Sequence, residues 1–175
     1  IRDTTILELI ESNPLAAGSP EWEHTEEIIC RAIQVKADVV GHDLKESLGT
    51  SAGREILNYG HTFGHAIERV ERYTWRHGAA VAVGMMYVGN LAVLTGRMSE
   101  GLLHRQQRIL EGVGLPTTYK GGSWDQLYAA MKIDKKSRGD LLRFVIIEAE
   151  GRPAILEGPD PALLVAAYQE IVQSS

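Results

Sequence analysis

The segment from Gly78 to Leu94 constrains the fold of this chain most, because it is apolar on every face of the helix that it predicts. A helix of this kind needs protein on all sides, so it belongs at the centre of the molecule. Its longest apolar run, Ala79 to Met86, is too short to cross a bilayer core of about 30 Å. We therefore predict a core helix with other elements packed around it.

Amphipathic helices are predicted on both sides of this core helix, since apolar residues recur three and four positions apart. These predicted helices cover Glu23–Val40, Arg54–Arg72, Ser99–Gly112, Ser123–Lys132 and Ala162–Val172, with a shorter one around Ile6, Leu7 and Ile10. The helix that spans Arg54 to Arg72 contains Gly60 and Gly64, each of which costs about 1 kcal/mol relative to alanine. We expect these glycines to serve close packing or the approach of a ligand.

One region predicts strands: Leu141–Ile147 and Pro153–Leu156, joined by a turn at Glu150-Gly151. Asp160 is expected to cap the last helix, and Pro161 to occupy its first turn. The predicted fold class is mainly α, a multihelical domain with at most one short β-hairpin. We expect residues 1–175 to form a single domain.

Charge and cysteine content exclude several classes of protein. The chain has 18 basic and 23 acidic residues, a net charge of −5, and the two signs are mixed along the sequence. A nucleic-acid surface would show a basic excess, so none is expected. The single cysteine, Cys30, excludes an internal disulfide and indicates a reducing cytoplasm; its apolar helical setting predicts a buried, inert thiol. We find no signal peptide and expect a cytoplasmic protein without membrane contact.

Three histidines form the most informative motif. His61 and His65 are four residues apart, on one face of a predicted helix, and His77 lies at the start of the core helix. Gathered together, three imidazoles would make a cluster of the type that zinc favours. One imidazole could instead donate to a phosphate oxygen or transfer a proton. Packed or surface histidines are the simpler alternative, and the glutamate that marks zinc proteases is absent after His61.

A second group of candidates is cationic and contains Lys36, Arg54, Lys135 and Lys136. Arginine binds carboxylates in a bidentate fork, and lysine serves phosphate as a point charge. The alternative is that these are solvated surface charges, with Lys135-Lys136 in an exposed turn.

These segments together resemble the 3-dehydroquinate synthases, and most closely the actinobacterial members. The resemblance covers nearly the whole chain, in order, through Lys36–Val40, Arg54–Glu68, Trp75–Met85, Gly114-Leu115-Pro116, Asp134–Lys136 and Leu142–Val145. It implies the C-terminal domain of the dehydroquinate synthase-like fold. It also implies a cytoplasmic lyase of the shikimate pathway to aromatic amino acids. Such an enzyme converts 3-deoxy-arabino-heptulosonate 7-phosphate to 3-dehydroquinate and phosphate, with NAD used transiently and zinc or cobalt as the metal.

The resemblance also implies roles for single residues. His61 and His77 would be two of three metal ligands, and His65 would face the substrate and assist proton transfer to phosphate. Glu46 matches the candidate carboxylate base. The substrate-binding residues would be Lys36 and Arg54 for the carboxylate, and Asn58 with Lys135 or Lys136 for the phosphate.

Two features of the family are missing from this sequence. The third metal ligand is a glutamate in an Ala-Glu-x-x-Lys segment, and a glycine-rich domain binds NAD; both precede this region. We therefore expect the isolated fragment to be inactive and to hold zinc weakly, with the N-terminal domain and a second subunit as partners. The loop Leu48–Gly53 is also longer than in relatives, which affects the placement of Glu46.

Three other functions are weighed against this one. Sugar-phosphate cyclases of the 2-deoxy-scyllo-inosose or valiolone type share the histidine pattern and NAD, but their substrates lack a carboxylate; Lys36 and Arg54 together favour the synthase. A glycerol dehydrogenase-like enzyme would not need Asp134-Lys135-Lys136. A non-catalytic helical assembly module would need none of these residues.

Overall fold

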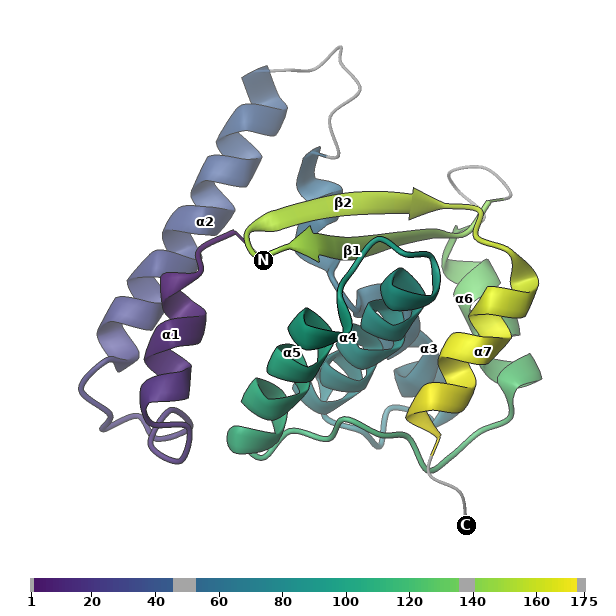
Figure 1. Ribbon diagram of the computed structural model, residues 1–175, viewed down its shortest axis with the longest axis horizontal. Coiled ribbons are helices and arrows are strands. Elements are labelled where there is room, and N and C mark those ends of the chain that lie inside the picture. Colours follow the sequence, from purple (N-terminus) through teal and green to yellow (C-terminus); the bar gives the residue numbers. More distant parts are fainter. Residues whose placement is uncertain (1, 46–52, 136–140, 173–175) are drawn as a thin grey trace.

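The computed structural model describes residues 2–45, 53–135 and 141–172. Over these residues the chain is mainly helical with one two-stranded antiparallel hairpin, as predicted (Figure 1). The elements are α1 (Thr5–Ser12), α2 (Thr25–Lys45), the 3-10 helix η1 (Gly53–Asn58), α3 (His61–Val70), α4 (His77–Leu94), α5 (Glu100–Gly112), α6 (Trp124–Lys135), β1 (Arg143–Ala149), β2 (Arg152–Glu157) and α7 (Pro161–Ile171).

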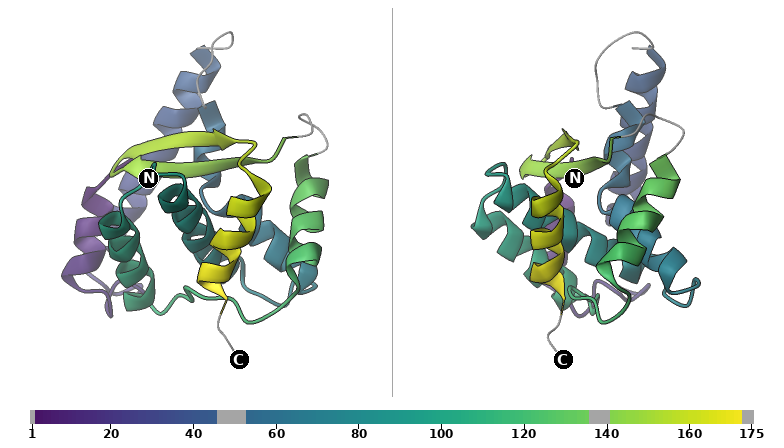
Figure 2. Two further views of the ribbon diagram at one scale, coloured as in Figure 1. Left: turned by 45° about the vertical axis from the view of Figure 1, so that its right-hand side comes forward. Right: turned by 90° about the vertical axis from the view of Figure 1, so that its right-hand side faces the viewer.

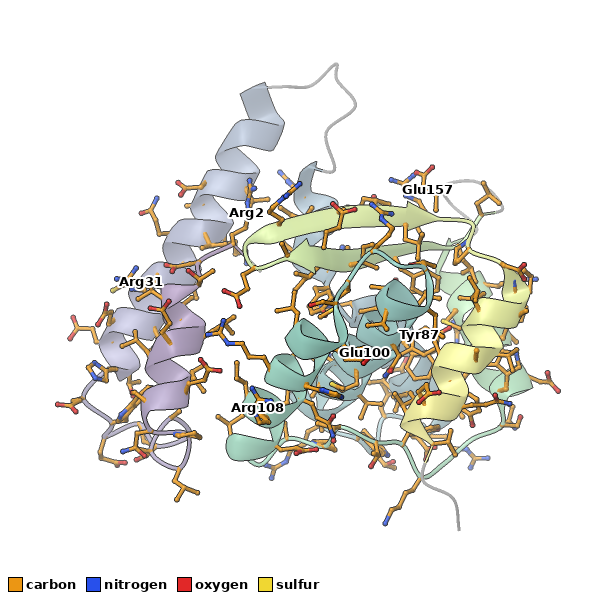
Figure 3. The ribbon with its side chains drawn as sticks, in the orientation of Figure 1. Arg2, Arg31, Tyr87, Glu100, Arg108 and Glu157 are labelled. Carbon is orange, nitrogen blue, oxygen red and sulfur yellow. The ribbon has the colours of Figure 1, made fainter. Side chains whose placement is uncertain are left out.

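Helix α4 lies at the centre, which confirms the prediction made from its apolar surface. It packs against α3, α5, α7 and β1. Tyr87 lies at the middle of α4 (Figure 3). Its ring stacks on Phe63 with ring centroids 4.0 Å apart, and its hydroxyl donates to the Leu164 carbonyl. By length and composition alone α4 meets the criterion for a membrane span, but 61% of that stretch is buried inside the fold. It is therefore the core helix of this domain.

The predicted helix from Arg54 to Arg72 is wrong in one respect, because it is broken in two. η1 ends at Asn58, and α3 begins at His61 after Gly60, whose φ is +77°. Glycine adopts this left-handed conformation without a steric penalty. The break separates a short segment that carries Arg54 and Asn58 from the helix that carries His61.

The glycines bring α3 and α4 into backbone contact, as expected for Gly60 and Gly64. A Cβ atom on Gly60 would lie 2.7 Å from the Met85 nitrogen, and one on Gly64 would lie 3.1 Å from the Ala80 carbonyl oxygen. On the facing helix, a Cβ atom on Gly84 would lie 2.0 Å from the Gly60 carbonyl oxygen. A larger residue at Gly60 or Gly84 would require the backbones to move apart, and one at Gly64 would be tightly packed.

Helix α2 extends past its predicted end at Val40 to Lys45 and projects from the rest of the fold (Figures 1 and 2). It packs on α1 and η1 through one face, where Val39 is buried. Cys30 is exposed, so the prediction of a buried thiol is wrong. The reason is that the apolar residues of α2 lie on more than one face of the helix, whereas the other described parts of the chain pack against only one of these faces.

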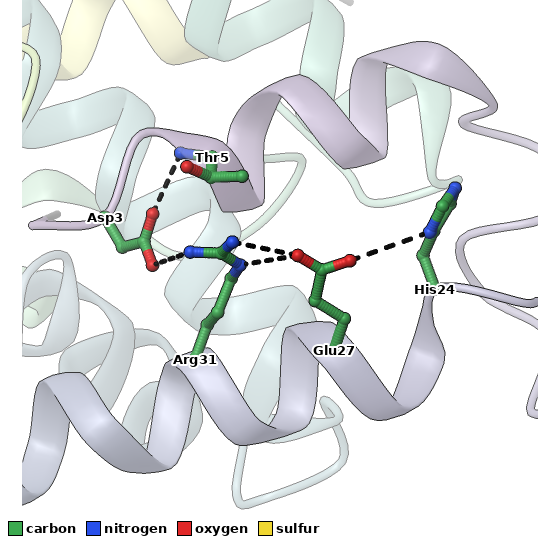
Figure 4. A network of polar contacts seen from close by, with 5 residues as sticks. All are labelled: Asp3, Thr5, His24, Glu27 and Arg31. Carbon is green, nitrogen blue, oxygen red and sulfur yellow. Dashed lines mark hydrogen bonds and ion pairs between the residues drawn. The ribbon is translucent and has the colours of Figure 1, made fainter.

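Ion pairs hold the N-terminal segment on α2 (Figure 4). Arg31 contacts Asp3 at 3.1 Å and Glu27 at 2.9 Å, while Asp3 also accepts a hydrogen bond from the Thr5 backbone N–H. On its other side α1 is held to α5, where Arg105 pairs with Glu11 at 2.6 Å. These contacts fix the start of the chain beside α2.

The hairpin lies across one end of the helices (Figures 1 and 2). Its first residue, Arg143, forms a bidentate ion pair with Glu55 of η1, at 3.0 Å between Nη2 and Oε2. The carbonyl oxygen of Arg143 accepts a hydrogen bond from the Thr62 hydroxyl of α3 at 3.3 Å. A single hairpin residue therefore holds both η1 and α3. At the start of α7, Asp160 accepts from the Ala162 N–H and Pro161 occupies the first turn, as predicted.

Candidate metal centre

His61, His65 and His77 lie together, as the cluster prediction required. One possible ligand atom from each lies within 4.8 Å of the others, and the ring centroids are 5.3 to 5.8 Å apart. His61 is half-buried, whereas His65 and His77 are exposed. The first two come from successive turns of α3, and the third is the first residue of α4. The close contact of α3 with α4 therefore builds the cluster.

Two of the three imidazoles are oriented by a second group. The Nδ1 atom of His61 lies 3.1 Å from the Tyr59 carbonyl oxygen, and Nδ1 of His77 lies 3.1 Å from Oε1 of Glu68. Because a carbonyl or carboxylate oxygen only accepts, each Nδ1 is the donor of its contact, and in the neutral ring this leaves the Nε2 lone pair for a metal. Histidine ligands of zinc are oriented in this way.

The chemistry of the donor set fits a zinc or cobalt ion. Neutral imidazole nitrogen is a preferred ligand of both metals. Burial lowers the pKa of His61, as do the nearby His65 and His77, although the hydrogen bond to Tyr59 and the charge of Glu68 oppose this effect. The lowered pKa favours the neutral form that binds metal.

Sequence reasoning missed Glu68 and Tyr59 as parts of this site. Glu68 could have been found, since it follows His61 and His65 on the same face of one helix. Tyr59 depends on tertiary structure, because its hydroxyl donates to Gln106 of α5, which in turn donates to the Met85 carbonyl at 3.0 Å. This chain of hydrogen bonds fixes the Tyr59 backbone and thereby the ring of His61.

A pocket of about 410 Å³ adjoins the histidines, between α3 and α6. Its size falls in the range of small-molecule pockets, about 300–1,000 Å³. The residues that line it are Thr62, His65, Ala66, Glu68, Arg69, Tyr73, His77 and Ala130.

Of the other predicted site residues, only some lie in the part of the chain that the structure describes. Arg54 and Asn58 are exposed on η1, which ends shortly before His61. Lys36 is exposed on α2. Lys135 is the last residue of α6, which packs on α3, but its side chain lies outside the described part of the chain. Glu46 and Lys136 also lie outside it, as does the predicted loop before Gly53.

Replacing Glu68 with glutamine is expected to lower zinc affinity about 10- to 100-fold, the usual effect of losing a residue that orients a histidine ligand. The amide keeps the size of the side chain but removes the charge that holds the Nδ1 proton of His77. Competition with a chelating dye measures the affinity. Glu170→Gln, an exposed change on α7, is the matched control and should bind zinc as the wild type does. Equal affinities for Glu68→Gln and wild type would show that Glu68 does not support His77.

Comparison with known proteins gives a family and a fold. Residues 1–137 match the family described as 3-dehydroquinate synthase C-terminal. The chain is 56% identical over 172 residues to 3-dehydroquinate synthase of Streptomyces coelicolor, covering 98% of this chain and 46% of that protein. It is 52% identical over 171 residues to the Thermobifida fusca 3-dehydroquinate synthase, covering 98% of this chain and 45% of that protein. The chain thus spans about half the length of these curated relatives.

Two solved structures share the fold. One is 2-epi-5-epi-valiolone synthase from Streptomyces hygroscopicus with NAD⁺ and Zn²⁺ bound; the TM-score is 0.81 at 19% identity, over 98% of this chain and 47% of that one. The other is 2-deoxy-scyllo-inosose synthase complexed with carbaglucose-6-phosphate, NAD⁺ and Co²⁺. Its TM-score is 0.66 at 26% identity, over 82% of this chain and 41% of that one. The predicted fold class is confirmed.

Proposed function

The chain belongs to the 3-dehydroquinate synthase C-terminal family, and from this membership we propose that it forms the metal- and substrate-binding half of a 3-dehydroquinate synthase. The whole enzyme would convert 3-deoxy-arabino-heptulosonate 7-phosphate to 3-dehydroquinate and phosphate. The observation that carries the proposal is the histidine cluster, in which His61 and His77 each present a free Nε2 because Nδ1 is already engaged.

In this proposal His61 and His77 would hold zinc or cobalt, each through the ring nitrogen that is not engaged by Tyr59 or Glu68. A bound metal supplies Lewis-acid polarisation of the reacting oxygen. His65 is exposed and lines the pocket, and its imidazole would face a bound substrate and assist proton transfer to the phosphate. The third metal ligand is a glutamate from the part of the relatives that precedes the matched region.

For the two ends of the substrate we propose the residues that the resemblance implies. Arg54 and Lys36 bind the carboxylate, Asn58 with Lys135 or Lys136 binds the phosphate, and Glu46 is the carboxylate base. The exposure of Arg54 and Asn58 on η1 supports their assignment, as does the ion pair of Glu55 with Arg143 that holds η1. An arginine fork suits a carboxylate, which favours a keto-acid substrate.

NAD would be bound mainly by a region that corresponds to the half of the relatives outside this match, since the chain spans about half of their length. The related structures that hold NAD⁺ together with Zn²⁺ or Co²⁺ support this combination of cofactors. We further propose a cytoplasmic homodimer in the shikimate pathway, with the N-terminal domain of the same protein as the other partner.

A carboxylate-free sugar phosphate is the second candidate substrate, because the valiolone and inosose synthases share the fold. An assay of phosphate release by the full-length protein, with NAD and zinc, distinguishes the heptulosonate phosphate from a carboxylate-free sugar phosphate as the substrate. We expect release from the heptulosonate phosphate and none from carboxylate-free heptulose or hexose phosphates. Release only from the carboxylate-free sugars would replace the proposed activity with that of a cyclase.

Zinc calorimetry on this chain, and on the same chain extended upstream through the expected glutamate, tests the divided site. The extended chain is expected to bind zinc tightly and the shorter one weakly, because tetrahedral sites need the additional ligand. Tight binding by both would mean that the three histidines form a complete site. Binding by neither would mean that the histidines are structural.

A further inference from the structure

The ion pair between Arg143 and Glu55 joins the hairpin to the short segment η1. The Nε atom of Arg143 lies 3.1 Å and 3.3 Å from the two carboxylate oxygens of Glu55, and its Nη2 atom lies 3.0 Å from Oε2. A bidentate contact of this kind fixes the relative direction of its partners as well as their distance. Only 15% of the Glu55 side chain is exposed, so salt and water screen this pair less than they screen a surface pair.

Arg143 is held firmly on the hairpin side. It is the first residue of β1, and its register partner Glu157 is the last residue of β2 (Figure 3). The Nη1 atom of Arg143 pairs with the Glu157 carboxylate, and its backbone carbonyl accepts from the Thr62 hydroxyl of α3. The next three residues of β1 are buried in the core. The guanidinium therefore extends from a backbone that the core keeps in place.

Glu55 connects this fixed point to the two exposed polar residues of η1. In a 3-10 helix the hydrogen-bond geometry is poorer than in an α-helix, and residues three apart lie on the same side. Glu55 directly follows Arg54 and lies three residues before Asn58. Arg54 and Asn58 are exposed, whereas Ile56 is buried. A rotation of η1 about Ile56 would redirect both exposed side chains, and the ion pair at Glu55 opposes that rotation.

We propose that Arg143 is a positioning residue for the substrate: its ion pair with Glu55 sets the orientation of η1 and thereby directs Arg54 and Asn58 toward the bound substrate. That these two residues bind substrate rests on the proposed function. The contact of Arg143 with α3 is made by its backbone carbonyl, so it survives replacement of the side chain. Substrate binding therefore depends on the guanidinium, and metal binding by the histidines of α3 does not.

The test is the kinetics of Arg143→Gln in the full-length protein with NAD and zinc. We expect its KM for the heptulosonate phosphate to rise about tenfold or more, because a displacement of about 1 Å in residues that position a substrate costs up to about 100-fold. We expect kcat to change less than about threefold, since a change in KM alone reports lost binding. Zinc affinity, measured by chelator competition, should equal that of the wild type.

Two further variants test whether the effect passes through Glu55. Glu55→Gln should raise KM as Arg143→Gln does, and the double variant should be no worse than either single variant. Arg143→Lys keeps the charge but loses the guanidinium fork, so it should recover only part of the lost affinity for substrate. Additive effects of the two glutamine substitutions would show that Arg143 does not act through Glu55.

Arg97→Gln is the matched control, because it breaks a similar ion pair to the hairpin that includes no residue of η1. Arg97 follows α4 and donates to Glu148 of β1, through Nε at 2.8 Å and Nη2 at 2.6 Å. Its side chain is about as exposed as that of Arg143. Arg97→Gln should lower Tm and leave KM at the wild-type value. Equal KM values in Arg97→Gln and Arg143→Gln would overturn the positioning role.

Hydrogen exchange measures the hold on η1 without any turnover. The backbone amides of η1 should exchange about threefold faster or more in Arg143→Gln than in Arg97→Gln, because the local opening of η1 no longer breaks the ion pair. Equal exchange in the two variants would show that the guanidinium does not hold η1.

Failure of this role and failure of the proposed function give different results. Wild-type turnover of the heptulosonate phosphate, with an unchanged KM in Arg143→Gln, rejects the positioning role alone. Absence of turnover in the wild type, with faster exchange of η1 in Arg143→Gln, rejects the proposed substrate and supports Arg143 as the residue that orients η1.

Discussion

Alanine at His61 or His77 in the full-length protein is expected to abolish turnover and tight zinc binding while the helical fold persists. Each variant removes a proposed nitrogen ligand whose ring contacts Tyr59 or Glu68. The loss of turnover should be at least about a hundredfold to a thousandfold, as for other groups that stabilise developing charge. Little apolar surface is lost, since His77 is exposed and His61 is half-buried. Phosphate release, bound-metal content and circular dichroism measure the three effects.

His104→Ala is the matched control for both variants. His104 is an exposed histidine on α5 and does not belong to the cluster. Its variant should keep the activity, zinc content and helical signal of the wild type. If His77→Ala were as active as His104→Ala, the role of His77 as a metal ligand would be wrong.

Gly84→Ala is expected to destabilise the protein and to weaken zinc binding together. The added methyl group would lie 2.0 Å from the Gly60 carbonyl oxygen, so the α3 and α4 backbones must move apart. Overpacking of a tight core costs roughly 1–3 kcal/mol of unfolding free energy. The same movement separates His77 on α4 from His61 on α3. Denaturant unfolding and zinc titration measure the two consequences.

Gly101→Ala is the control, because Gly101 is helical and, apart from its chain neighbours and the backbone of its own helix, nothing lies within 4 Å of its added Cβ. Alanine is the better helix former, so this variant should be neutral or stabilised by up to about 1 kcal/mol. Wild-type stability and zinc affinity in Gly84→Ala would show that the glycine contact does not position the cluster.

Most of the fold could be predicted because its signals are local. The apolar surface of the segment Gly78–Leu94 required a central position, and the alternation after Leu141 required a strand. The break at Gly60 could not be predicted, since one glycine is tolerated inside a helix at a modest cost. The neighbouring backbone of α4 decides the conformation there, and that contact is tertiary.

The candidate site likewise has parts that the local sequence predicts and parts that only tertiary contacts decide. The spacing of His61 and His65 predicted two members of the cluster, and the central helix supplied His77. The ring of His61 is oriented through Tyr59, which is held by Gln106 of α5, and no pattern near the histidines indicates that contact. The prediction that Cys30 is buried was wrong because the other described parts of the chain pack against only one of the apolar faces of α2.

The hairpin contact at Arg143 has a consequence for the order of folding. Helices α3 and α4 follow one another in sequence, so the metal ligands meet by closing a short loop. Arg143 reaches Thr62 across 81 residues and Glu55 across 88, contacts that form slowly in a folding chain. We therefore expect the histidines of the proposed metal site to assemble early and η1, which carries the proposed substrate-binding residues Arg54 and Asn58, to be fixed only when the hairpin docks. Metal capture and substrate recognition would then be acquired one after the other during synthesis of the chain.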